Sequence, residues 1–325
     1  MTQVPARPRY RLHVLLFLLT LLTTTIQGAL YVNGRLQDGL AFSLPLMAIL
    51  VCHEFGHYFA AKAHGVPASL PYFIPLPPLI SPFGTMGAVI TQGGGTTDRR
   101  KLIDIGAAGP LAGLVVAIPV LIYGLLHSEV RPLVGEGMQE GNSLLYAGLK
   151  YLLKHEWLPG GGRDVMLHPT AWAGWAGLLI TMINLLPIGQ LDGGHIATAY
   201  FGNRYARAAR VVHKLLPWLG LVAFGWVYNV AQDEIAGKLV PSSRALVMGI
   251  QAAVTWLVLY GLLAWLGRMV GGLDHPPVDD VRPLPRSRAA LFWVVAVVFA
   301  LIFMPVPVRD TIGADPPPDK GSAPP

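Results

Sequence analysis

Long apolar segments separated by short polar ones make up most of this 325-residue chain. A membrane-spanning helix needs about 20 consecutive, mainly apolar residues. Segments of about this length occur at 12–32, 40–63, 102–126, 170–191, 215–231, 245–267 and 289–308. The pattern predicts an all-α polytopic membrane protein with about six to seven transmembrane helices.

Residues 66–97 interrupt this pattern. They contain no Asp, Glu, Lys or Arg but are rich in proline and glycine, which excludes a continuous helix. Irregular backbone at membrane depth is tolerated only where protein or a water-filled cavity satisfies its polar groups. We therefore expect a small re-entrant β-hairpin here, with residues 85–91 as one strand. A further helix at the membrane interface is expected at 143–155.

Composition and charge agree with a membrane protein. Hydrophobic residues make up 53% of the chain, charged residues make up only 13%, and a soluble domain averages about 25% charged residues. The net charge of +6 is spread between the apolar segments, so no nucleic-acid partner is indicated. Most basic residues fall on the cytoplasmic side if the N-terminus is cytoplasmic. The single cysteine, Cys52, excludes an intramolecular disulfide and a cysteine-rich zinc site.

The motif His53-Glu54-Phe55-Gly56-His57 lies inside the second apolar segment. Two histidines one helical turn apart can bind one zinc ion, and the intervening Glu54 can act as a general base. Ionisable groups at membrane depth are costly and are usually functional. The motif therefore predicts His53 and His57 as metal ligands toward the cytoplasmic end of this helix.

A catalytic zinc ion usually has three protein ligands, so a third must come from elsewhere. Asp104 and Asp192 are the aspartates in or beside apolar segments. Asp104 follows basic residues at the start of its segment, where a carboxylate complements a helix N-terminus. Asp192 lies at the same expected depth as the histidines, after a helix that Pro187 should break, and is the better candidate. Asn184, nearby, could donate its amide to a substrate carbonyl oxygen.

Together these motifs resemble the site-2 protease family of intramembrane zinc metalloproteases. The matching stretches are HEFGH at 53–57, NLLPIGQLDG at 184–193 and PFGTMGAVI at 82–90; the last resembles members that lack a PDZ domain. The resemblance implies one Zn²⁺ per chain held by His53, His57 and Asp192. It implies Glu54 as catalytic base, Asn184 as a substrate-orienting residue and hydrolysis of a peptide bond within or near a transmembrane segment.

The same reading gives a domain organisation, a partner and a location. We expect an N-terminal cytoplasmic segment and first transmembrane helix at 1–39, a catalytic core at 40–200, C-terminal transmembrane helices at 201–308 and a disordered proline-rich tail at 309–325. The expected partner is a single-pass membrane-protein substrate in the lipid bilayer. The expected location is a bacterial inner membrane, with the active site toward the cytoplasm.

Two other interpretations of the His, Glu and Asp cluster stay open. Intramembrane ionisable residues also line the ion pathways of metal or proton transporters. A non-catalytic protein could keep the same fold and only bind membrane partners. The clustering of the ionisable residues at one depth favours the protease.

Overall fold

The computed structural model describes residues 9–32, 34–78, 80–92, 97–236, 238, 241, 243–269, 277–279 and 282–314. The chain folds into two compact units, each built from segments that are distant in sequence. The first unit draws on Met1–Ser128, Leu167–His213 and Leu263–Phe303. The second draws on Glu129–Met166, Lys214–Leu262 and Met304–Pro325.

Helices dominate the first unit. They are α1 (Tyr10–Val32), α2 (Leu36–Ala63), α3 (Arg99–Leu126), α5 (Pro169–Asn184), α6 (Asp192–Phe201) followed by the 3₁₀ turn η1 (Gly202–Arg204), and α9 (Arg286–Ile302). Two long helices belong to both units: α7 (Tyr205–Ile235) begins in the first, and α8 (Ser243–Met269) begins in the second.

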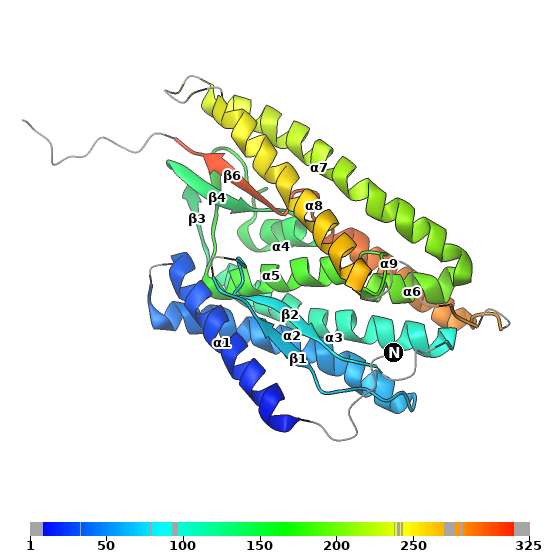
Figure 1. Ribbon diagram of the computed structural model, residues 1–325. Coiled ribbons are helices and arrows are strands. Elements are labelled where there is room, and N and C mark those ends of the chain that lie inside the picture. The colour runs from blue at the N-terminus through cyan, green and yellow to red at the C-terminus, as the bar shows by residue number, and fades with distance from the viewer. Residues whose placement is uncertain are drawn as a thin grey trace, which may run out of the picture. The chain divides into compact units, whose positions relative to one another are not determined.

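The centre of the first unit is the packing of α2, α3 and α5 against one another (Figure 1). Small residues let these helices approach closely, as is common between membrane helices. A Cβ atom added at Gly56 of α2 would lie 2.5 Å from the carbonyl oxygen of Ala108 on α3. One added at Gly124 of α3 would overlap the backbone of Ala171 on α5. Larger side chains at these contacts would push the helices apart.

The expected hairpin is present beside these helices. Strand β1 (Tyr72–Pro75) pairs antiparallel with β2 (Thr85–Val89), with Tyr72 opposite Val89. In the part of the chain that the structure describes, β2 has no other partner strand, so one of its edges is open.

Helix α1 holds the hairpin from the side (Figure 1). The His13 Nδ1 atom hydrogen-bonds to the Pro71 carbonyl oxygen at 2.9 Å, and the Thr23 hydroxyl donates to the Gly84 carbonyl oxygen at 2.6 Å. Gly84 has a φ of +73°, and a Cβ atom there would lie 2.5 Å from the Thr23 carbonyl oxygen. Only glycine therefore fits the turn where α1 contacts it.

Five helical segments of the described chain are long and apolar enough to cross a membrane. They are Tyr10–Tyr31, Leu36–Ala63, Arg99–Leu126, Asp192–Ile235 and Ser243–Trp265. The expected number of six to seven was slightly too high. The expected span 170–191 is not one helix, because α5 ends at Asn184 before Pro187 and the chain turns until α6 begins at Asp192. The expected span 289–308 is not among the five either, because helix α9 has only 17 residues.

The second unit contains two antiparallel strand pairs and a short helix. Strand β3 (Glu129–Pro132) pairs with β5 (Arg163–Met166), and β4 (Glu136–Glu140) pairs with β6 (Val308–Ile312). Helix α4 (Leu144–Lys154) begins after Ser143, whose hydroxyl accepts a hydrogen bond from the Tyr146 amide. The expected helix at 143–155 is thus confirmed.

Strand β6 corrects the expected disordered tail at 309–325. Residues 309–312 lie in this strand because β4 supplies its hydrogen-bonding partner, whereas residues 315–325 lie outside the described residues. The other expected boundaries, at 39/40 and 200/201, stay predictions.

We predict that Thr23→Val loosens the hairpin, because the Gly84 carbonyl oxygen loses its tertiary hydrogen-bond donor. The free energy of unfolding should fall by about 1–2 kcal/mol, and amide hydrogens of 72–89 should exchange faster. Thr24→Val is the matched control, since the Thr24 hydroxyl donates to the carbonyl oxygens of Thr20 and Leu21, which both lie within α1. Equal exchange in the two variants would contradict a role of Thr23 in holding the hairpin.

Candidate metal centre

Helix α2 carries His53, Glu54 and His57 on its inner face. Their exposed fractions are 3%, 5% and 6%, so all three lie inside the packed helices and not in bulk solvent. The segment is helical because a long apolar sequence surrounds the motif. Helical geometry then places the two imidazoles one turn apart on one side of α2.

Asp192 reaches the histidines from a distant part of the chain. It is the first residue of α6, after the turn at 185–191 in which Gly189 has a φ of +56°. A Cβ atom at Gly193 would overlap the Leu185 carbonyl group, so the glycine after Asp192 lets α6 begin against this turn. The break between α5 and α6 thus directs the Asp192 carboxylate inward.

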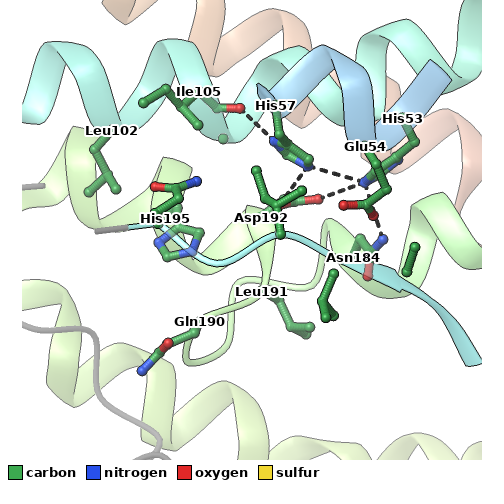
Figure 2. A pocket seen from close by; sticks show the side chains of 15 residues that line it. His53, Glu54, His57, Leu102, Ile105, Asn184, Gln190, Leu191, Asp192 and His195 are labelled. Atoms are coloured by element: carbon green, nitrogen blue, oxygen red, sulfur yellow. Dashed lines mark hydrogen bonds and ion pairs between the residues drawn. The ribbon is translucent and has the colours of Figure 1, made fainter. Parts of the chain in front are cut away.

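The side chains of His53, His57 and Asp192 converge on one point (Figure 2). The two Nε2 atoms are 3.2 Å apart, and each lies 3.2 Å from a different oxygen of the Asp192 carboxylate. Ligand atoms that are about 2.0–2.1 Å from a tetrahedral zinc ion lie about 3.3–3.4 Å from one another. The observed separations agree closely with that spacing.

Hydrogen bonds around the group determine which atoms face its centre. The His57 Nδ1 atom lies 2.8 Å from the Ile105 carbonyl oxygen, which only accepts, so Nδ1 donates and the neutral ring presents the Nε2 lone pair. The Asn184 amide nitrogen lies 3.4 Å from the His53 Nε2 atom. Two imidazole nitrogens and a carboxylate therefore face one another mainly as acceptors. A bound cation is the partner that this donor set fits.

Helix α3 approaches the imidazoles through two glycines. A Cβ atom at Gly109 would overlap the His57 ring, and one at Gly113 would lie 3.2 Å from the His53 Cβ atom. The Gly109-to-Gly113 spacing is the small-residue pattern typical of closely packed membrane helices. Here it also leaves room for the two histidines.

A cavity of about 180 Å³ opens beside these side chains. Its walls come from the first unit and include the three converging residues. Helix α2 adds Glu54, α3 adds Leu102, Ile105 and Gly106, and the end of α5 adds Asn184. The remaining residues are Ala88, Val89, Ile90 and Gln92 on and after β2, and Gln190, Leu191 and His195 around the start of α6. The hairpin strand with the open edge therefore forms one wall of the cavity.

The structure brings together all five residues that the sequence indicated. His53, His57 and Asp192 form the converging group, and Glu54 and Asn184 line the same cavity. Sequence reasoning missed the Ile105 carbonyl group, because backbone acceptors leave no trace in residue type. It also missed the contact of Gly109 with His57, for which the glycine spacing was the available signal.

Asp104 and His64 lie in a separate cluster. The Asp104 carboxylate contacts the His64 Nε2 atom at 3.0 Å and the Arg288 guanidinium at 2.9 Å. We expected Asp104 to complement a helix N-terminus, but Asp98 caps α3 by accepting a hydrogen bond from the Arg100 amide. Asp104 instead joins α2, α3 and α9.

Comparison with known proteins identifies relatives. The model of the family described as "Peptidase family M50" matches residues 41–223, more than half of the chain. The "Probable zinc metalloprotease EGY2, chloroplastic" of Oryza sativa subsp. indica is 34% identical over 59% of this chain and 35% of its own length. The "Probable zinc metalloprotease EGY1, chloroplastic" of Arabidopsis thaliana is 34% identical over 81% of this chain and 43% of its own length. This chain thus spans less than half the length of these relatives. No solved structure matches significantly.

We predict that Gly109→Ala removes most metal binding, because the new methyl group would occupy the space of the His57 ring. The substitution raises helix propensity, so loss of binding would report the contact and not a weakened α3. Gly113→Ala is the graded comparison, since its methyl group would only crowd His53 and should weaken binding less. Zinc content of the purified protein, with circular dichroism to check the helices, measures the effect. Wild-type zinc content in Gly109→Ala would refute the contact.

Proposed function

The chain belongs to peptidase family M50, the family of the site-2 proteases, and from this membership we propose that it is an intramembrane zinc metalloprotease. The observation that supports the proposal most directly is the convergence of the His53, His57 and Asp192 ligand atoms inside buried helices. This donor set with one neighbouring glutamate is typical of zinc peptidases.

In this proposal His53, His57 and Asp192 hold one Zn²⁺ per chain. The ion would polarise the scissile carbonyl group and make a water molecule more acidic. The Ile105 carbonyl group keeps the His57 ring in the tautomer that offers Nε2. The close fit of Gly109 against that ring keeps its position.

Glu54 is the proposed general base. Its side chain lines the same cavity as His57 and Asp192. The Glu54 carboxylate would take a proton from the attacking water as the new C–O bond forms. It would then give that proton to the amide nitrogen as the peptide C–N bond breaks.

Asn184 is the proposed orienting residue. It lines the cavity at the end of α5, where its amide nitrogen can donate to the carbonyl oxygen of the scissile bond. The same amide lies 3.4 Å from the His53 Nε2 atom, so Asn184 lies directly beside the proposed metal. A donor at this position would stabilise the negative charge that develops on the carbonyl oxygen.

The open edge of β2 suggests how a substrate reaches the site. Peptide bonds inside a transmembrane helix are hydrogen-bonded and inaccessible, whereas an extended segment added to a strand edge exposes them. Ala88, Val89 and Ile90 line the cavity, so a segment paired with β2 would pass beside Glu54. We therefore propose a membrane-protein substrate, of the single-pass type, that unwinds locally before cleavage.

The chain is a multi-pass membrane protein by the number and length of its apolar helices. The expected bacterial inner membrane is not supported, because the relatives carry names that describe them as chloroplastic. We also propose that the metal site faces the side of the membrane that carries most of the lysines and arginines. The transport alternative is not favoured, since the family whose model matches this chain is a peptidase family.

We predict that Glu54→Gln lowers the cleavage rate by roughly 10²–10⁴-fold, the usual contribution of a general base. Zinc content should stay at one per chain, because Glu54 is not a proposed ligand. The measurement is cleavage of single-pass reporter proteins in proteoliposomes, followed by mass spectrometry of the fragments.

Glu129→Gln is the matched control for Glu54→Gln, since Glu129 is an exposed carboxylate paired with Arg131 in the other unit. A chelator should abolish wild-type cleavage, and added zinc should restore it. Undiminished turnover by Glu54→Gln would remove Glu54 from the mechanism. Zinc flux across the vesicle membrane without any fragment would instead favour a transporter.

We predict that Asn184→Leu lowers kcat by roughly 10²–10³-fold and leaves KM nearly unchanged, because a donor to a developing oxyanion acts in the transition state. Gln190→Leu removes another cavity amide and should retain activity. If Asn184 only orients His53, zinc affinity would fall in parallel with kcat. That parallel loss is the result that would contradict the proposed role.

A further inference from the structure

The Asp192 carboxylate is the one proposed metal ligand that does not lie on α2. Its two oxygen atoms lie 3.2 Å from the Nε2 atoms of His53 and His57. Ligands of a working site must be held within about 0.5 Å of their productive geometry. In Figure 2 Asp192 points toward the imidazoles, whereas Gln190, two residues earlier, points away from them. A small rotation of the chain before Asp192 would therefore remove a ligand from the site.

The chain around Asp192 has little stiffness of its own. Residues 185–191 form the turn between α5 and α6, and Gly189 in this turn has a φ of +56°. Two further glycines follow directly after Asp192. Glycine restricts the backbone less than any other residue. Helix α6 also begins at Leu191 without a side-chain cap. The start of α6 must therefore be held by contacts from outside the turn.

The far end of α6 is tied to α3. The Arg99 Nε atom donates to the Ala199 carbonyl oxygen at 2.7 Å, and its Nη2 atom donates to the Tyr200 carbonyl oxygen at 2.6 Å. A cation at the last carbonyl groups of a helix also interacts favourably with the helix dipole. Helix α3 carries Ile105, which orients the His57 ring. Arg99 thus fixes the end of α6 that is remote from the metal site, and the near end remains to be fixed.

Tyr205, the first residue of α7, holds that near end. Its hydroxyl donates a hydrogen bond to the Pro187 carbonyl oxygen in the middle of the turn. A carbonyl oxygen only accepts, so the tyrosine must be the donor. Among the described residues, no other side chain is hydrogen-bonded to 185–191. Tyr205 therefore provides the directional link between this turn and the helix that follows α6.

The Tyr205 side chain is itself well fixed. It is only 7% exposed and packs with Ala197 on α6 and Ala209 on α7. Its ring also stacks on Phe201, the last residue of α6, at a centroid distance of 5.9 Å. The hydrogen bond joins two residues 18 positions apart that lie on either side of α6. It therefore ties the chain before α6 to the chain after it.

We propose that Tyr205 is a positioning residue for the metal. Its hydroxyl holds the peptide group of Pro187, and through it the start of α6, so that the Asp192 carboxylate faces both imidazoles. Tyr205 does not line the metal cavity, so it acts through the turn and not on the ion. The inference rests on the metal site of the proposed function.

The test compares Tyr205→Phe with the wild type, each as the full chain in lipid nanodiscs. The variant keeps the ring and loses only the hydroxyl, so the packing along α6 is retained. The zinc dissociation constant should rise roughly fivefold, as expected for the loss of one net hydrogen bond. In the metal-free variant, amide hydrogens of 185–194 should exchange faster than in the wild type, and bound zinc should restore their protection.

Tyr146→Phe is the matched control. It removes another buried tyrosine hydroxyl, which donates to Glu140 at 2.8 Å in the second unit and outside the metal cavity. Both variants lose one hydrogen bond, so both should lower the midpoint of thermal unfolding. Tyr146→Phe should nevertheless keep the wild-type zinc affinity and the wild-type exchange at 185–194. This comparison separates positioning of the ligand from general stability.

Four results would count against the proposal. Unchanged zinc affinity in folded Tyr205→Phe overturns it and leaves the proposed function intact. An equal loss of affinity in Tyr146→Phe overturns it as well, because the weakening then reflects stability alone. Weaker zinc binding without faster exchange at 185–194 shows that the hydroxyl does not act through the turn. A wild type that binds no zinc refutes the proposed metal site, and this inference with it.

Discussion

The crowding of hydrogen-bond acceptors at the centre of the first unit is the constraint on which its structure depends. The Nε2 atoms of His53 and His57 and the Asp192 carboxylate lie 3.2 Å from one another inside packed helices. Without a positive charge between them, such groups would repel one another or share protons at a considerable energetic cost. The chain nevertheless holds them together from several directions. The arrangement is therefore understandable as a preorganised cation site and not as ordinary core packing.

Three features of the backbone enforce this arrangement. Helix α2 provides two imidazoles one turn apart, and the break after α5 allows α6 to begin with its first carboxylate facing them. Helix α3 contributes the Ile105 carbonyl group and the space at Gly109. Each feature is local, but the site requires all three at once. This explains why glycine and proline positions are as informative about the site as the ligands themselves.

The sequence allowed prediction of those features that depend only on residue type and on the spacing of nearby residues. The His53 to His57 spacing, the position of Asp192 after Pro187 and the strand at 85–89 follow from residue type and short-range pattern alone. Features that depend on distant partners were not predictable. Strand β6 exists because β4 pairs with it, and Asp104 is committed to Arg288, which lies 184 residues away. The number of spanning helices was overestimated because hydropathy detects an apolar segment but not the turn that divides it at Pro187.

The role of α1 extends this argument to the boundary of the catalytic part. The family match begins at residue 41. The apolar pattern of residues 10–32 alone predicts only a helix that crosses the membrane. Yet His13 and Thr23 hydrogen-bond to the two ends of the hairpin, at Pro71 and Gly84. The hairpin contributes the β2 residues that form one wall of the metal cavity. Helix α1 contacts both strands of the hairpin, so it helps to hold that wall in place. The structural unit that positions the proposed chemistry therefore begins well before the residues that carry its motifs.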